Sequence, residues 1–162
     1  MPAQHLRTTL LAEVAAKLET ITIANGYTRN VARVFQTPPN AMNIGTPAIV
    51  ITQGTESIEE FVGDRLERDL SVNLTFVDAY AGDDADGEAL EFLADVQRAI
   101  GSMLTFTISA TRKSGGTGTA TVRITEEGSA LNFGDPIRGK IYGVVTYSIL
   151  YRTSATDPGL LP

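Results

Sequence analysis

The sequence predicts an α+β domain: a mostly antiparallel β-sheet with two amphipathic helices packed on one face. Three observations support this class. Residues 6–24, and the stretch from an acidic loop at 81–87 to Met103, repeat apolar side chains at helical spacing. Residues 66–80 alternate apolar and polar side chains, as a half-buried strand does. Shorter apolar runs add strands that do not alternate one for one with the helices.

The first helix is expected over residues 6–24, because one apolar stripe runs along it. The stripe consists of Leu6, Leu10, Val14, Leu18 and Ile21. Asn25-Gly26 is expected to end this helix, since glycine adopts the left-handed conformation at a helix C-terminus without steric cost. A short strand is expected next at 31–35, followed by a loop at 36–46 that is rich in proline and glycine.

Two strands are expected before the acidic loop. The continuous apolar run 48–52 is typical of a buried strand. In the longer strand, 66–80, the period of two predicts one buried face and one face toward water. The buried face is expected to hold Leu66, Leu70, Val72, Leu74, Phe76 and Tyr80, and the other face Glu67, Asp69, Ser71, Asn73 and Thr75.

The second helix is expected to start at an N-cap formed by Asp84 or Asp86. Its expected apolar stripe consists of Leu90, Leu93, Val96, Ile100 and Met103.

Strands at 104–111 and 120–125 are expected next, joined by a connection at 112–119. The last strand, 141–152, is apolar on both faces and is therefore expected to be central or covered on both sides. Residues 153–162 form a tail without periodicity.

Composition limits the function more than it specifies it. A chain of 162 residues, 43% hydrophobic and 20% charged, is most simply one globular domain, 1–162. There is no cysteine, and His5 is the only histidine, so thiol catalysis and multi-histidine metal sites are excluded. The N-terminus does not resemble a signal peptide, and no apolar stretch is long enough to cross a bilayer.

Charge is distributed unevenly along the chain, whose net charge is −6. Residues 56–95 contain thirteen acidic and two basic residues, whereas the rest contains eleven basic and six acidic residues. Solvated surfaces explain this pattern slightly better than the alternative, two complementary faces for head-to-tail contacts between copies. The chain as a whole is too acidic for a dedicated nucleic-acid-binding protein.

No motif in the chain predicts catalysis. The run 83–87 is rich in aspartate, but a calcium loop with Gly87 at its sixth position would need ligands at Gly82 and Leu93, which have no carboxylates. The glycine-rich run 115–118 joins two expected strands, whereas a phosphate loop leads into a helix. No serine lies in a Gly-x-Ser-x-Gly pattern. We therefore expect no enzyme activity, no metal and no cofactor.

The order of elements resembles the tail-terminator and tail-completion proteins of long-tailed bacteriophages, such as siphophage minor tail proteins. The resemblance rests on the first helix with Ala24-Asn25-Gly26-Tyr27, the following run Val31-Ala32-Arg33-Val34, and the strand 47–53. It continues through the strand 69–80 feeding a helix with Leu93-Ala94-Asp95-Val96, and through Tyr151-Arg152-Thr153 and Asp157-Pro158 at the end. Region 112–140 lies outside it.

The resemblance implies a structural virion protein that forms a hexameric ring at the head-proximal end of the tail. Such a ring would end polymerisation of the tail tube and join the tail to the head connector. The implied partners are further copies of the chain, the tail tube protein and the connector or neck protein. The protein would be made in the host cytoplasm. DNA would pass through the lumen without specific binding, and an acidic lumen formed by part of 56–95 would suit this.

If the chain forms such a ring, its loops and tail are the expected contact sites, an ordinary surface being the alternative for each. The expected interface residues are Pro38, Pro39, Asn40 and Met42 in the irregular loop, Arg112, Lys113 and Gly116 at the hairpin tip, and Tyr151, Arg152 and Asp157 leading into the tail. The alternative functions are another ring-forming tail-tube, neck or head-completion protein and, less favoured, a small-ligand or peptide-binding module.

Overall fold

The computed structural model describes residues 6–37, 45–80, 82–132 and 139–162, without the side chains of 59–61 and 132. Its elements in chain order are α1 (Leu6–Leu18), the 3-10 helix η1 (Ile23–Asn25), β1 (Arg33–Phe35), β2 (Ala48–Val62), β3 (Arg65–Ala79), α2 (Ala85–Gly101), β4 (Thr105–Thr111), β5 (Thr117–Asn132) and β6 (Lys140–Ser154).

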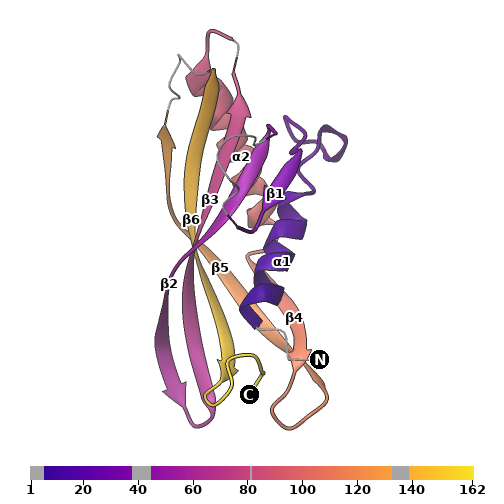
Figure 1. Cartoon of the computed structure of the whole chain (residues 1–162), viewed down its shortest axis with the longest axis vertical. Helices are drawn as coiled ribbons and strands as arrows, with labels where there is room; N and C mark the ends of the chain where they lie inside the picture. Colours follow the sequence, from indigo (N-terminus) through magenta and orange to yellow (C-terminus); the bar gives the residue numbers. More distant parts are fainter. Residues whose placement is uncertain (1–5, 38–44, 81, 133–138) are drawn as a thin grey trace.

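The strands form one sheet in the order β1-β2-β3-β6-β5-β4 (Figure 1). Among the pairings of the described strands, only the short one of β1 with β2 is parallel. The predicted α+β class is confirmed. The last strand, β6, is central, as its two apolar faces predicted, since it pairs with β3 along one side and with β5 along the other.

The core lies between the helices and one face of the sheet. The predicted stripe of the first helix is buried throughout, and Leu70, Val72, Leu74 and Phe76 of β3 face it. The predicted stripe of the second helix is wrong at Leu90, which is 53% exposed. Ala89 and Phe92 are buried in its place, because the helix is turned so that Phe92 packs on Phe76, with ring centroids 4.7 Å apart.

The first helix is shorter than predicted. It ends at Leu18, and Thr20 donates its hydroxyl to the carbonyl oxygen of Lys17 at 2.7 Å. A hydroxyl that bonds a nearby carbonyl competes with helix continuation. The chain then forms η1, which is capped by Thr22, and Gly26 ends it with a left-handed φ of 80°. Gly26 thus ends a helical segment, as expected. This segment is the short 3-10 helix η1, which follows α1, and not α1 itself.

Two strands are longer than predicted. The run 48–52 extends to Val62, and the strand expected at 120–125 covers Thr117–Asn132. Both extensions are largely polar, so they carry no apolar signal and form through backbone pairing with β3, β4 and β6. Asp84, one of the two expected N-caps, does cap α2, accepting a hydrogen bond from the backbone of Gly87 at 2.8 Å.

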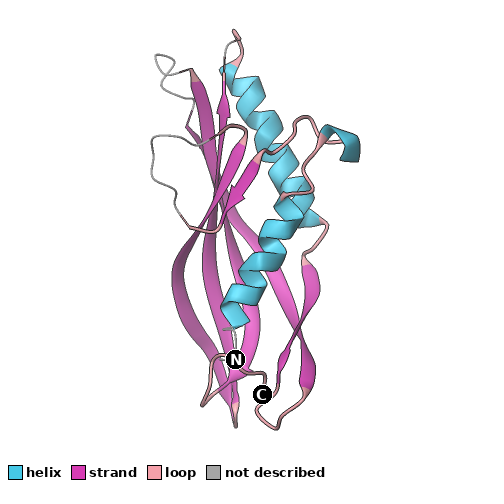
Figure 2. Ribbon diagram, turned by 45° about the vertical axis from the view of Figure 1, so that its right-hand side comes forward, coloured by secondary structure: helices cyan, strands magenta, loops and turns pink. Residues whose placement is uncertain are grey.

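The molecule is elongated, and its helices cover only part of the sheet. Figures 1 and 2 show the β2–β3 and β4–β5 hairpins extending past the start of α1. The C-terminal residues lie at the same end. The two hairpin tips are joined there, because Lys113 Nζ lies 3.0 Å from the Asp64 carboxylate. Among the described residues, this end of the molecule therefore consists of strands, turns and the tail, without a helical layer.

Candidate functional site

The described residues contain no group of three or more His, Cys, Asp or Glu side chains that could hold a metal ion. Within the same residues, no helix has the length and apolar character needed to span a bilayer. The cavity inside the apolar core measures about 10 Å³, which is too small for a ligand. Three polar arrangements remain, two at the ends of the core and one in a surface groove.

The first arrangement, the Arg29 cluster (Arg29, Asp78 and Phe92), ties the loop after η1 to α2. Arg29 is 8% exposed, and its guanidinium lies 2.8 Å from the Asp78 carboxylate and 4.6 Å above the Phe92 ring. Nearby, Thr28 donates both its backbone N–H and its hydroxyl to buried Asp95, at 2.9 and 2.6 Å. The polar and charged groups of Arg29, Asp78, Thr28 and Asp95 thus find their hydrogen-bond and ion-pair partners within the chain, as a structural role requires.

The second arrangement is the Glu56 cluster, which lies at the start of α1, where Arg7 of this helix pairs with Glu56. Its members are Arg7, Glu56, Arg68 and Tyr151. The Glu56 carboxylate is 2.8 Å from the Arg7 guanidinium and 2.9 Å from that of Arg68. It also accepts a hydrogen bond from the Tyr151 hydroxyl. Arg68 reaches Thr153 as well, at 2.9 Å, so the cluster joins α1, β2, β3 and β6.

The pKa values in this cluster follow from burial and pairing. Burial would raise the pKa of Glu56, but hydrogen bonds from Tyr151 and Arg7 outweigh it and lower the pKa of this carboxyl. Burial, with the Glu56 hydrogen bond, raises the pKa of Tyr151 to about 12. The cluster thus holds a carboxylate and a neutral phenol at neutral pH, which favours an ion-pair network over acid–base chemistry.

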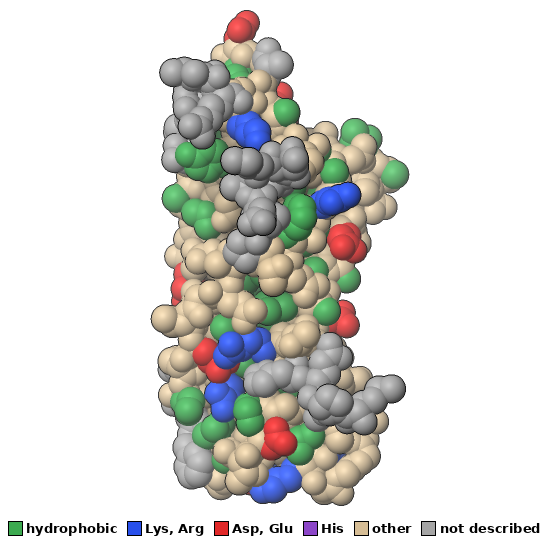
Figure 3. All heavy atoms as spheres, in the orientation of Figure 1, with side chains coloured by type: hydrophobic (Ala, Val, Ile, Leu, Met, Phe, Trp, Pro, Cys, Tyr) green, Lys and Arg blue, Asp and Glu red, His purple; other side chains and the backbone are tan. Residues whose placement is uncertain are grey.

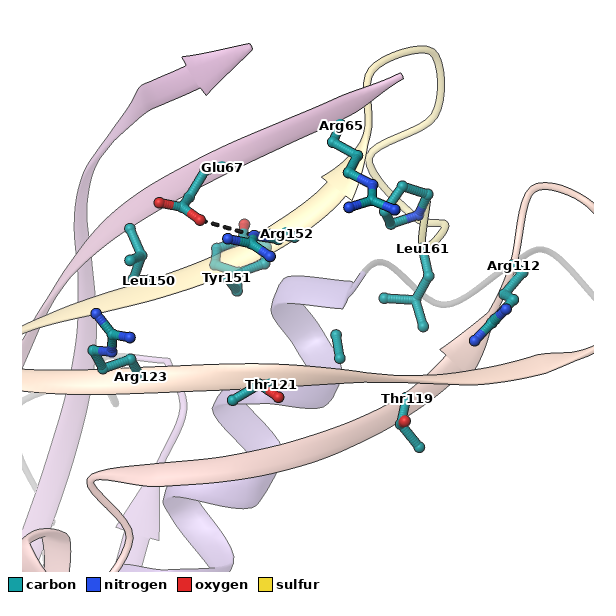
Figure 4. Close-up of a pocket in the computed structure, with 12 residues that line it drawn as sticks. Arg65, Glu67, Arg112, Thr119, Thr121, Arg123, Leu150, Tyr151, Arg152 and Leu161 are labelled. Atoms are coloured by element: carbon teal, nitrogen blue, oxygen red, sulfur yellow. Dashed lines mark hydrogen bonds and ion pairs between the residues drawn. The ribbon is translucent and has the colours of Figure 1, made fainter. Parts of the chain in front are cut away.

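The third arrangement is a groove of about 410 Å³ between β5 and β6 (Figure 4). We call it the arginine groove, because Arg65, Arg112, Arg123 and Arg152 line it from four different parts of the chain. All four side chains are exposed. Among the described residues that line the groove, Glu67 is the only one with an acidic side chain, and it pairs with Arg152 at 2.8 Å. No described acidic side chain forms an ion pair with the other three arginines.

The predicted interface residues fall into three groups. Pro38, Pro39, Asn40 and Met42 lie outside the described residues. Arg112, Lys113 and Gly116 are exposed at the β4–β5 tip, as are Arg152 and Asp157 near the C-terminus. Tyr151 is 1% exposed in the Glu56 cluster, so its side chain is a core group and not a contact surface. Alternation places it on the helix-facing side of β6, whereas Arg152 points outward.

The acidic segment 56–95 divides between two ends of the fold. At the hairpin end, Glu56, Asp64 and Glu67 are paired with basic side chains. At the start of α2, Asp83 and Asp86 are exposed. Figure 3 shows acidic and basic side chains interspersed on the face seen in Figure 1. At the hairpin end, these three acidic residues are thus paired by contacts within the chain.

Sequence reasoning missed the arginine groove and both ion clusters. The signal for the clusters is present in the strand 66–80, where Arg68 and Asp78 interrupt the apolar face that holds Leu66, Leu70 and Phe76. The groove has no local signal, because its arginines come from β3, β5, β6 and the β4–β5 turn. No family model matches this chain, and no curated protein matches it significantly in sequence.

Proposed function

We propose that this protein is a structural virion protein of the tail-terminator type, which forms a ring that caps the tail tube and joins the tail to the head. The observation that carries the proposal is the pair of open edges on its sheet. On one side, β1 pairs only with Ala48, Ile49 and Val50, so within the described part of the chain residues 51–62 of β2 form an edge. On the other side, β5 is the only described strand that pairs with β4, and of the β4 residues only Thr111, at its end, bonds to the C-terminal residues, so the rest of β4 is a second edge.

These edges lie on opposite sides of the sheet, so they suit a head-to-tail contact. The β2 edge of one copy can meet the β4 edge of the next, and a contact of this kind closes into a ring when the rotation between copies permits it. Open edges are otherwise a liability for a soluble monomer. The β2 edge also exposes Ile58 and Val62, at 57% and 58%, which a neighbouring copy would cover.

The architecture bears on the alternatives. A tail-tube protein of the β-sandwich type would have two packed sheets, whereas the described strands form one sheet with helices on one face. A small-ligand-binding protein would have a deep apolar pocket, but the cavity within the described core is about 10 Å³. Another ring-forming neck or head-completion protein remains the second candidate, because open edges serve it equally well.

Native mass spectrometry and negative-stain imaging of the purified full chain test the proposal. We expect closed rings of one defined stoichiometry, with six copies as the leading expectation from the resemblance. A strictly monomeric protein at all concentrations would contradict the ring. Open filaments in place of rings would contradict closure, since a terminator must stop growth and not propagate it.

A further inference from the structure

The arginine groove exists because β5 and β6 separate in the middle of the sheet. Their pairing ends at Arg123 and Leu150. Beyond this point residues 117–122 of β5 pair only with β4, and residues 151–154 of β6 pair only with β3. Two strand edges therefore face each other across the groove, although neither strand is at the edge of the sheet as a whole. Such edges carry backbone groups that seek partners.

Strand alternation identifies which backbone groups face the groove. Ile124 donates its N–H to the carbonyl oxygen of Leu104, the residue before β4, so the backbone groups of Ile124 face β4. Backbone groups alternate in direction along a strand, so the N–H and C=O of Thr121 and Thr119 point away from β4 and toward the groove. On β6, the backbone N–H of Ser154 points to the groove side and donates a hydrogen bond to the carbonyl oxygen of Leu160 at 2.9 Å. The backbone of Arg152 faces the same side by the same alternation. Both walls thus offer the hydrogen bonds of a strand edge.

The chain's own C-terminal residues already form one backbone hydrogen bond to the β6 edge. The carbonyl oxygen of Leu160 accepts a hydrogen bond from the backbone N–H of Ser154 on β6. The backbone N–H of Leu161 donates to the carbonyl oxygen of Thr111 on β4 at 2.9 Å. Leu161 is 2% exposed and lines the groove. The C-terminal turn that contains Leu160 therefore already bonds to the neighbouring position on the β6 edge, while the positions of Arg152, Thr119 and Thr121 remain beside the groove (Figure 4).

The charge of the groove selects the chemistry of its ligand. The described residues that line it include four arginines and one glutamate, Glu67, which forms an ion pair with Arg152. Figure 4 shows Arg123 on the β5 wall, with Arg65 and Arg112 farther along, near Leu161. Carboxylates are natural partners for exposed guanidinium groups, which bind them through two parallel hydrogen bonds. Phosphates share this property, but they do not satisfy paired strand edges.

We propose that the arginine groove binds an extended acidic peptide segment of a partner protein, which adds to the β5 and β6 edges and pairs its carboxylates with Arg123, Arg65 and Arg112. Backbone pairing supplies affinity in this mode, and side chains at alternate positions supply specificity. The site lies within one chain, so it goes beyond the proposed function and does not depend on ring formation.

The test uses a peptide of about six residues that alternates glutamate and valine, titrated into the full chain and followed by amide chemical shifts in NMR. We expect saturable shifts at Thr119, Thr121 and Arg152. Arg123→Ala should weaken binding about tenfold, because it removes a charged hydrogen-bond partner. Arg123 is exposed, so this variant should keep its fold. Arg33→Ala, an exposed arginine on β1, is the matched control and should bind as the parent does.

Two further probes separate strand addition from attraction of charge alone. The same peptide methylated at alternate backbone nitrogens should bind far more weakly, since it cannot pair with both edges. A single-stranded oligonucleotide of similar charge should bind more weakly than the unmodified peptide. No peptide binding, binding that Arg123→Ala leaves unchanged, equal binding of the methylated peptide, or tighter binding of the oligonucleotide would each overturn the proposal.

Discussion

Arg68 and Asp78 lie on the same helix-facing side of β3, one toward each end of the apolar core, and each is paired with a charge from another segment. Arg68 meets Glu56 of β2, and Asp78 meets Arg29 of the loop before β1. The side chains of β3 between them include the buried Leu70 and Phe76. Because a one-residue slip would turn either charge toward the other face, the two pairs help to fix the register of β3.

Arg29→Ala is expected to lower the free energy of unfolding by about 3 kcal/mol, because it leaves the Asp78 carboxylate in a half-buried position without its partner. It also removes the contact between the guanidinium and the Phe92 ring. Urea unfolding followed by circular dichroism measures the change. Arg33→Ala, on the exposed side of β1, is the control and should change stability by less than about 0.5 kcal/mol. Equal effects of the two substitutions would contradict the assigned role of Arg29.

Glu56→Gln is expected to cost about 2 kcal/mol near pH 7, where a carboxylate binds Arg7, Arg68 and Tyr151. The pKa of Glu56 is lowered by folding, so its contribution is complete above the usual value of 4.5 and is lost as pH falls through the lowered pKa. The stability difference between parent and variant should therefore shrink as pH falls below 4.5. Unfolding curves at several pH values measure this, and a difference independent of pH would argue against the lowered pKa.

Gly143→Ala is expected to destabilise the sheet by about 2 kcal/mol, because the added methyl group would overpack the core. A Cβ at this position would lie 2.5 Å from Phe76 Cζ and 2.8 Å from Leu131 Cδ2. Thermal unfolding measures the change. The control is Gly128→Ala on β5, where a Cβ would meet no atom within 4 Å. The close packing of Phe76 on β6 would be contradicted if both alanines had the same small effect.

Ile58→Lys and Val62→Lys are expected to weaken assembly without unfolding the chain. Both side chains are more than half exposed on the β2 edge, so the change in stability should stay within about 0.5 kcal/mol. Charge on an edge strand opposes pairing with another chain. Sedimentation velocity should show a shift toward the monomer, whereas Leu90→Lys, at another exposed apolar position on α2, should leave assembly intact. Rings that persist with both lysines would exclude this edge as the contact.

The sequence predicts the elements whose apolar period is strong. The stripe of the first helix, the alternation within β3 and the central position of β6 all follow from apolar side chains that must be buried. The extensions of β2 and β5 could not be predicted in this way. Polar residues such as Thr117 and Thr119 carry no burial signal, and their strand conformation comes from pairing with β4.

The candidate sites depend on long-range contacts that no local pattern encodes. Arg7 and Tyr151 meet at Glu56 although they lie near opposite ends of the chain. The sequence predicts Tyr151 as an interface residue next to the end of a strand expected at 141–152, whereas β6 continues to Ser154 and keeps the Tyr151 side chain in the core. The arginine groove likewise depends on where β5 leaves β6, which is a property of the sheet and not of either strand.

The most direct test of the proposed function is to let the tail tube protein of the same virion polymerise with and without this chain and to measure tube lengths by electron microscopy. We predict that the chain stops growth and leaves a ring at one end of each tube. The Ile58→Lys and Val62→Lys double variant should lose this effect, and the Leu90→Lys control should keep it. Tubes that grow to the same lengths and carry no cap in the presence of the parent chain would contradict the proposal.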